Sequence, residues 1–336
     1  MQKTYNTTMI FDLHCDTIWK IDESERSGTK PISLRKNKLQ IDEEKLKKGK
    51  YFAQCFAVYI PNKYEDCYQR CLNAIAIFQR EIEKSKLLSP VHRYGDFKKN
   101  KANCRVSAIL TMEDGCPIGK DLKRLQFFYE LGVRMICLTH NYVNEIGYPN
   151  LCENRETSVP APSQPNTKDG LTEFGRELVL TMNKLGIIVD TSHLSDKGFY
   201  DAIKISEKPI VASHSNARGL CTHIRNLTDD MLFKLADNGG VMGINYAKQF
   251  LHNTPSLGEK TVECVVAHMK YIKKKIGVEH IALGSDFDGI DENIELCDCS
   301  KLGKLIVALR KENFTDSEIK KITYQNALRV FRANLV

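Results

Sequence analysis

Eight short runs of apolar, largely β-branched residues recur along the chain, and amphipathic stretches separate most of them. Most of the runs are almost continuously hydrophobic, which is typical of parallel strands that are covered on both faces. The runs span residues 8–14, 51–59, 105–113, 133–140, 186–193, 209–214, 240–246 and 280–286. The pattern therefore predicts eight buried strands.

Stretches with a helical period follow these strands at 65–85, 120–131, 173–185, 196–206, 229–238, 259–276, 300–311 and 315–333. Thr315 and Glu318 have the spacing of a capping box at the start of the last helix. Strands that alternate with helices form a parallel sheet, and eight strands close it. We therefore predict an α/β fold, a (β/α)8 TIM barrel that forms a single domain over residues 1–336.

An open sheet of six or seven strands is the alternative to the barrel. No glycine fingerprint of the dinucleotide-binding type follows the first run, which argues against an open cofactor-binding sheet. Two segments exceed a minimal barrel, a charged excursion at 20–50 and a connection rich in Asn, Pro and Ser at 141–172. Loops of this length are usually functional lids or disordered.

Composition and charge limit the kinds of partner and surroundings that we expect for this protein. The net charge is +7, but the lysine runs lack the interleaved aromatic residues of a nucleic-acid module, so no nucleic acid is expected. The start of the chain has no apolar signal region, and no apolar run approaches 18 residues, so we expect no membrane span. Many of the twelve cysteines lie in apolar runs, and Cys67 with Cys71, or Cys297 with Cys299, lacks the paired spacing of a structural zinc site. Free thiols in a reducing compartment, the cytoplasm, are the expectation.

Side chains that bind metals follow the apolar runs where each run ends. In a barrel of this kind the carboxyl ends of the strands meet at one face, and that face carries the active site. A lone histidine at a strand end is usually structural, but four of the nine histidines at one face indicate a shared role. The strand-end residues are His14, Asp16, Glu113, His140, His193, His214, Asp286 and Asp288.

These residues predict a two-metal site. His14 and Asp16 are two positions apart, so on an extended strand they point the same way and can hold one ion together. His193 and His214 come from neighbouring strands and can hold a second ion, with Glu113 as the bridge. Imidazole and carboxylate ligands suit Zn²⁺ or a similar transition ion. Two such ions can activate a bridging water as hydroxide and polarise a carbonyl, which needs no serine or cysteine nucleophile.

The strand-end set resembles the renal-type (membrane) dipeptidases of the amidohydrolase superfamily over essentially the whole chain. The matching stretches are DLHCDT at 12–17, MEDG at 112–115, YELGVRMICLTHN at 129–141, GLTEFG at 170–175, DTSH at 190–193, SHSNARGLCTHIRNLTDD at 213–230 and GSDFDG at 284–289. Each stretch is weak alone, and the set together is specific.

The resemblance implies a role for each matching residue. One zinc would be held by His14, Asp16 and Glu113, and the other by Glu113, His193 and His214. His140 would stabilise the oxyanion at the scissile carbonyl, and Arg225 would hold the carboxylate of a dipeptide. Asp286 would carry a proton from the water to the leaving amine and contact the amino group of the substrate. Asp288 is close enough in sequence to take that role instead.

The expected activity is a zinc-dependent dipeptidase that cleaves dipeptides, L,D-dipeptides among them, with a metal-bridging hydroxide as nucleophile. Two departures from the family stand out. Asp114 replaces the usual glycine after Glu113, and from the sequence given we expect neither the secretion signal nor the lipid anchor of mammalian members. It therefore resembles the soluble microbial members, and a homodimer is expected.

Residues outside this set are expected to have smaller roles. Asn245 and Tyr246 are candidates for the pocket lining. The five remaining histidines are interpreted as structural or non-catalytic, namely His92, His223, His252, His268 and His280.

Two other functions remain open. A different binuclear amidohydrolase could act on cyclic amides, lactones or phosphoesters, but many of those bridge their metals with a carboxylated lysine at the end of strand four, where this chain has His140. A non-catalytic barrel that binds metal or a partner surface is the third hypothesis, and metal content would test it.

Overall fold

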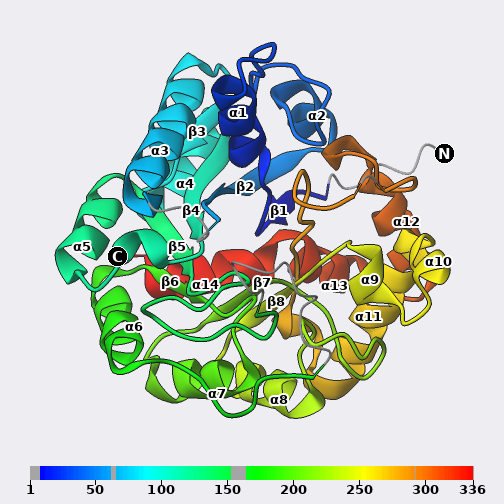
Figure 1. The fold of residues 1–336 in the computed structure, drawn as a ribbon. Coiled ribbons are helices and arrows are strands. Elements are labelled where there is room, and N and C mark those ends of the chain that lie inside the picture. Colours follow the sequence, from blue (N-terminus) through cyan, green and yellow to red (C-terminus); the bar gives the residue numbers. More distant parts are fainter. Residues whose placement is uncertain (1–7, 62–65, 153–163, 292, 336) are drawn as a thin grey trace.

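Eight parallel strands close into a barrel in the computed structural model, which describes residues 8–61, 66–152, 164–291 and 293–335 (Figure 1). Each strand pairs with the next in the ring, and the pair Asp12–Leu283 joins the last strand to the first. The (β/α)8 prediction is thus confirmed. The barrel strands are β1 (Ile10–Asp12), β2 (Tyr51–Tyr59), β4 (Val106–Glu113), β5 (Val133–Cys137), β6 (Ile188–Asp190), β7 (Val211–Ser215), β8 (Val241–Ile244) and β9 (Ile281–Leu283).

A short additional strand, β3 (Leu88–Pro90), lies beside the N-terminal residues of the barrel strand β4. It pairs with the first residues of β4, from Val106 to Ala108, whereas β5 pairs with β4 only from Leu110 onward. The two strands therefore share one edge of β4. Three residues are too few for a hydrophobic period, so the sequence did not indicate this strand.

Most of the strands end before the polar residues that close the predicted runs. β1 ends two residues before His14, β5 three before His140, and β6 three before His193. Those residues lie in the loops and turns that leave the barrel. His193 has φ 69°, and similar positive values occur at Asp114, Asp286 and Asp288, with φ 73°, 62° and 70°. The chain turns sharply at the carboxyl face, and these turns aim the side chains of His193 and Asp286 at the ligand cluster.

The helices surround the barrel and match the predicted ones closely. They are α3 (Cys67–Lys84), α5 (Leu122–Glu130), α6 (Glu173–Leu185), α7 (Asp196–Ile205), α8 (Asp229–Asp237), α11 (Thr261–Ile276) and α12 (Gly303–Lys311). Hydroxyl caps begin several of them, because Thr172, Ser195 and Thr228 each accept a backbone N–H of the first turn.

Several short helices were not predicted. The excursion at 20–50 contains most of α1 (Thr17–Arg26) and all of α2 (Glu43–Lys48), and α4 (Gly95–Ala102) follows β3. Two more, α9 (Lys248–Leu251) and α10 (Pro255–Gly258), follow β8. Part of the long connection at 141–172 lies outside the described residues.

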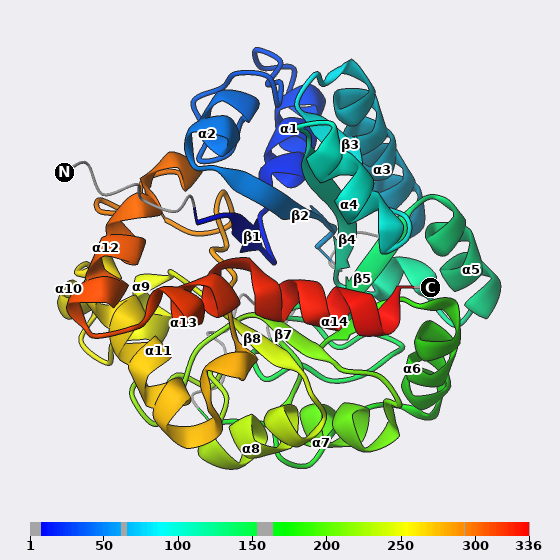
Figure 2. The same cartoon turned by 180° about the vertical axis from the view of Figure 1, so that it is seen from behind.

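The last predicted helix is continuous but changes its winding. The capping box of Thr315 and Glu318 begins α13 (Asp316–Lys320), a π-helical turn follows at Lys321–Gln325, and α14 (Asn326–Asn334) ends it. Figure 2 shows α14 lying across one end of the barrel. Phe331 of α14 packs 5.1 Å from Phe11 of β1, ring centre to ring centre, within the cluster that fills the barrel. The helix α14 therefore closes the end of the barrel at which the strands begin. A functional site can form at the opposite end, where the carboxyl ends of the strands lie.

None of the helices in the described ranges is long and apolar enough to cross a membrane. The described cysteines form no disulfide bond with one another.

Candidate metal centre

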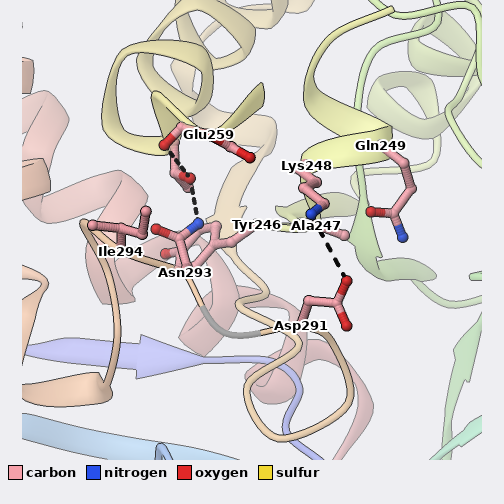
Figure 3. A pocket seen from close by; sticks show the side chains of 9 residues that line it. Tyr246, Ala247, Lys248, Gln249, Glu259, Asp291, Asn293 and Ile294 are labelled. Carbon is pink, nitrogen blue, oxygen red and sulfur yellow. Dashed lines mark hydrogen bonds and ion pairs between the residues drawn. The ribbon is translucent and has the colours of Figure 1, made fainter. Parts of the chain in front are cut away.

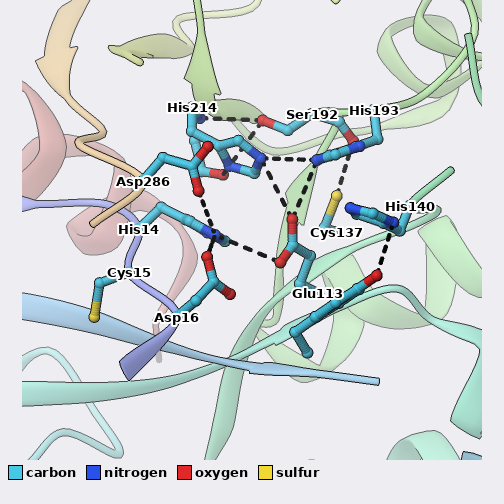
Figure 4. A network of polar contacts seen from close by, with 12 residues as sticks. His14, Cys15, Asp16, Glu113, Cys137, His140, Ser192, His193, His214 and Asp286 are labelled. Carbon is cyan, nitrogen blue, oxygen red and sulfur yellow. Dashed lines mark hydrogen bonds and ion pairs between the residues drawn. The ribbon is translucent and has the colours of Figure 1, made fainter. Parts of the chain in front are cut away.

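The predicted metal ligands meet at the carboxyl face of the barrel, although they are spread over two hundred residues (Figure 4). Glu113 is the last residue of β4, and His214 lies within β7. His14 and Asp16 follow β1, and His193 follows β6. All five are buried. The fold therefore brings the whole predicted ligand set together.

The carboxylate of Glu113 faces two different groups with its two oxygens. Oε2 lies 3.6 Å from Nε2 of His14, which is itself 3.3 Å from Oδ2 of Asp16. Oε1 lies 3.1 Å from Nε2 of His193 and 3.5 Å from Nε2 of His214. One carboxylate thus stands between a His–Asp pair and a His–His pair, as a bridging ligand would.

The spacing of these atoms fits small transition ions. Zinc ligands at 2.0–2.1 Å in a tetrahedron lie about 3.3 Å from one another. His14, Glu113 and His214 offer ligand atoms within 4.8 Å of one another, and so do His14, Asp16 and Asp286. Oδ1 of Asp16 is buried and has no hydrogen-bond partner in the described structure. A buried carboxylate oxygen without a partner, among three imidazoles and a second carboxylate, fits the metal that the sequence predicts.

The electrostatics differ between the two halves of the site. Burial would lower the pKa of His14, but the carboxylates of Glu113 and Asp16 outweigh it and raise that pKa well above its usual value. Burial, with Arg225 and the other histidines, depresses the pKa values of His193 and His214 well below the ordinary range. These two imidazoles are therefore neutral near pH 7, which is the form that binds a metal.

Outer residues set the tautomers of the paired histidines. The hydroxyl of Ser213 donates to Asp190, so it accepts at 2.8 Å from Nδ1–H of His214 and leaves Nε2 with a lone pair. Oδ1 of Asn141 lies 2.9 Å from Nδ1 of His193 and acts in the same way. Such partners orient metal-binding imidazoles. Sequence reasoning missed Ser213, Asp190 and Asn141 because their roles depend on neighbours, although all three lie within the quoted motifs.

His140 lies beside the ligands and is partly exposed to the pocket. It offers a nitrogen within 4.8 Å of ligand atoms of Glu113 and His193. Its Nδ1 is 3.3 Å from the hydroxyl of Tyr59 in β2. This position next to both the ligands and open space suits a donor to a substrate oxygen.

The two candidate aspartates have different surroundings. Asp286 lines the pocket, with Oδ1 3.7 Å from Nε2 of His14 and Oδ2 accepting from Asn245 at 2.8 Å. Burial raises its pKa to about 6. Asp288 points the other way, where its oxygens accept from Thr17 and from the backbone N–H of Gln40, both at 2.6 Å. Of the two aspartates, Asp286 faces the pocket. Asp288 instead holds the excursion at 20–50 next to the site through its hydrogen bond with Gln40.

Arg225 lines the same pocket, a cavity of about 300 Å³. Its side chain is buried, and Nη2 reaches the carbonyl oxygen of His214 at 3.4 Å, while Nε has no hydrogen-bond partner in the described structure. Within the described ranges no carboxylate forms an ion pair with it. A buried guanidinium of this kind is suited to bind an anionic group of a ligand.

Asp114, the departure beside Glu113, points neither toward the ligands nor outward. Its Oδ1 accepts from the side chain of Asn144 at 2.7 Å and from the backbone N–H of Cys116 at 2.9 Å. Burial raises its pKa to about 7. Asp114 therefore ties the turn after β4 to the loop that follows β5.

Two residues expected in the pocket lie beside it instead. Asn245 is fully buried and holds Asp286, and Tyr246 borders a second, smaller cavity of about 60 Å³ (Figure 3). His223 accepts the backbone N–H of Arg225 at 3.2 Å, which is a structural role. The lining also contains aromatic and apolar side chains that the sequence did not single out, namely Trp19, Tyr59, Leu151, Phe250 and Ile290.

Comparisons with known proteins point to one family. A family model described as membrane dipeptidase (peptidase family M19) matches residues 1–335. Dipeptidase tcpJ of Claviceps purpurea (strain 20.1) is 29% identical over 304 residues, which are 87% of this chain and 68% of that protein.

Two solved structures are similar along their whole length. The dipeptidase AC, a metallopeptidase of family M19, has a TM-score of 0.86 and 26% identity, over 98% of this chain and 99% of that one. A metallopeptidase from Rhodobacter sphaeroides, liganded with a phosphinate mimic of the dipeptide L-Ala-D-Ala, has a TM-score of 0.86 and 25% identity, over 98% and 100%.

Proposed function

Because the chain belongs to the membrane dipeptidase family, peptidase family M19, we propose that it is a dipeptidase that works with two zinc ions. The proposal rests on the position of the Glu113 carboxylate, because one of its oxygens faces a His–Asp pair and the other faces a His–His pair. In this proposal His14, Asp16 and Glu113 hold one ion, and Glu113, His193 and His214 hold the other. Such ions would supply Lewis acidity and an ionised bridging water, a hydroxide, as nucleophile.

The remaining pocket residues would position and complete the reaction. Arg225 would bind the free carboxylate of the dipeptide, because it is a buried cation without an acidic partner in the described structure. His140 would donate to the carbonyl oxygen as negative charge develops, an effect commonly worth about 3 kcal/mol of barrier. Asp286, oriented by Asn245, would take the proton of the attacking water and deliver it to the leaving amine.

L,D-dipeptides are proposed among the substrates. The related metallopeptidase from Rhodobacter sphaeroides was solved with a phosphinate mimic of L-Ala-D-Ala, and its fold matches this chain closely. A cavity of about 300 Å³ is of the size that small ligands occupy. A homodimer and a cytoplasmic location remain predictions.

The test is an assay of metal-loaded and chelated protein on L,L- and L,D-dipeptides, their N-acetyl forms and their C-terminal amides. We expect hydrolysis of free dipeptides by the loaded protein alone, with two zinc ions bound per chain. Glu113→Gln should lose activity and metal, whereas the exposed control Glu130→Gln on α5 should keep both. Turnover that survives chelation, or equal turnover of the amides, would contradict the proposal.

A further inference from the structure

A largely buried ion pair stands outside the metal centre and joins the loops around it. Arg218 forms a two-pronged contact with Asp196, the first residue of α7, through Nη1 and Nη2 at 2.7 Å each. Asn150 donates to the same carboxylate at 2.7 Å. Charge-assisted, bidentate contacts of this kind are stronger and more directional than ordinary hydrogen bonds.

The guanidinium of Arg218 also holds the backbone on both sides of Arg225. Its Nη2 donates to the carbonyl oxygen of Ile224 at 2.9 Å, and its Nε donates to that of Asn226 at 2.8 Å. The segment is held further by the backbone N–H of Arg218, which donates to Leu227 at 2.7 Å. The residues before and after Arg225 are therefore fixed to α7.

Asn150 connects this segment with a proposed metal ligand. Its backbone N–H donates to the carbonyl oxygen of His193 at 3.0 Å, and its side chain donates to that of Ile224 at 2.9 Å. Asn150 is 2% exposed, so these bonds lie away from water. One buried residue thus links the turn of His193, through its backbone, to the residue before Arg225, through its side chain.

We propose that Arg218, Asp196 and Asn150 are positioning residues that set the distance between Arg225 and the metal centre. The inference rests on the proposed dipeptidase function, because it assumes that Arg225 binds the substrate carboxylate. The side chain of Arg225 has only one hydrogen bond in the described structure, a long one of 3.4 Å, so its place depends on how the backbone around it is held, which the three residues help to do. A fixed distance restricts cleavage to amides whose free carboxylate lies one residue beyond the scissile bond.

The test compares Arg218→Met with a matched control, Arg176→Met. Arg176 pairs with Asp201 at 3.0 Å on the outer helices α6 and α7 and does not line the pocket. Each protein is loaded with zinc, its metal content is measured, and kcat and KM are determined for a dipeptide and its C-terminal amide. Binding of a phosphinate dipeptide analogue with a free carboxylate is measured as a second readout.

We expect Arg218→Met to raise KM for the dipeptide about tenfold or more, since small misplacements of a binding group have effects of this size. The preference for dipeptide over amide should fall in parallel, the analogue should bind correspondingly more weakly, and kcat and metal content should stay near the wild type. Arg176→Met should change none of these values.

Other results would overturn the inference. An unchanged KM and an unchanged preference for the dipeptide would show that the position of Arg225 does not depend on Arg218. A fall in metal content and kcat together with a raised KM would show that Arg218 only stabilises the fold around the site. If Arg218→Met does not fold, Asp196→Asn/Arg218→Met removes both charges and is judged by the same criteria, and its failure to fold would also count against a positioning role. Absence of dipeptidase activity in the wild type would instead refute the proposed function before any variant is compared.

Discussion

Gly289 lies against the proposed metal centre so closely that one added methyl group should disturb it. A Cβ atom at this position would lie 2.7 Å from Oδ1 of Asp286 and 3.0 Å from Cγ of Asp16, and closer still to Oδ2 of Asp16. Ordinary contact begins near 3.4 Å. Both carboxylates must therefore move by well over the roughly 0.2 Å that a metal ligand tolerates.

The expected loss of metal affinity follows from the energetic cost of this crowding. Overpacking of this kind typically costs about 1–3 kcal/mol, and each 1.4 kcal/mol is about a factor of ten in affinity. Gly289→Ala should therefore weaken binding of the ion on the His14–Asp16 side by about 5- to 150-fold. The ion on the His193–His214 side should be affected less, because the three atoms nearest the new methyl group belong to Asp16 and Asp286.

Zinc titration against a competing chelator measures the two affinities, and kcat/KM at fixed free zinc measures the consequence. Gly303→Ala is the matched control, because a Cβ there meets nothing within 4 Å and the glycine begins α12. That control should bind metal normally and gain up to about 1 kcal/mol of stability. If Gly289→Ala binds both zinc ions with the affinities of the wild type, the reasoning is refuted.

Three further predictions test single residues. Arg225→Met should raise KM for dipeptides by about 10- to 150-fold, as expected for a lost charge-assisted contact of about 1.5–3 kcal/mol, and an unchanged KM would remove it from carboxylate binding. Asp286→Asn should lower kcat by about 10²–10⁴-fold, whereas Asp288→Asn should lower the unfolding free energy and leave kcat within about threefold; the reverse result would exchange their roles. Burial lowers the pKa of His268 to about 4, so the folded protein disfavours the proton that the unfolded chain binds below pH 6.5. The stability that neutral His268 contributes is therefore complete above that value, and about 2.5 kcal/mol is lost between pH 7.5 and 4.5. Urea unfolding should show a flatter pH dependence in His268→Gln, and identical slopes would exclude this cause.

The parts of the fold that sequence predicts are those that local pattern determines. β2 was predicted at its observed bounds because nine residues of a buried strand are almost continuously apolar. The proposed ligands were found because strand ends in a barrel converge on one face. Elements whose existence depends on distant partners were missed. Gln40, for example, exchanges two bonds with Asp288, 248 residues away, and that contact orders an excursion that has no apolar period.

The same distinction applies within the site. Neutral partners such as Ser213 and Asn141 acquire their function only from the imidazole that each one faces, and no spacing in the sequence marks them. The strand boundaries also extended too far, because the apolar pattern continues into loops that remain buried. His140 and His193 lie beyond their strands for this reason.

The left-handed backbone at His193 and Asp286 has a consequence for engineering. An L-residue in this conformation is disfavoured by roughly 1–2 kcal/mol, and glycine is not. Directed evolution for heat tolerance alone would therefore reward glycine at these positions, although His193 and Asp286 carry the proposed chemistry. A library screened for thermal survival without a turnover assay should enrich inactive chains at these positions, and the frequency of such variants would report how much stability is given up for activity.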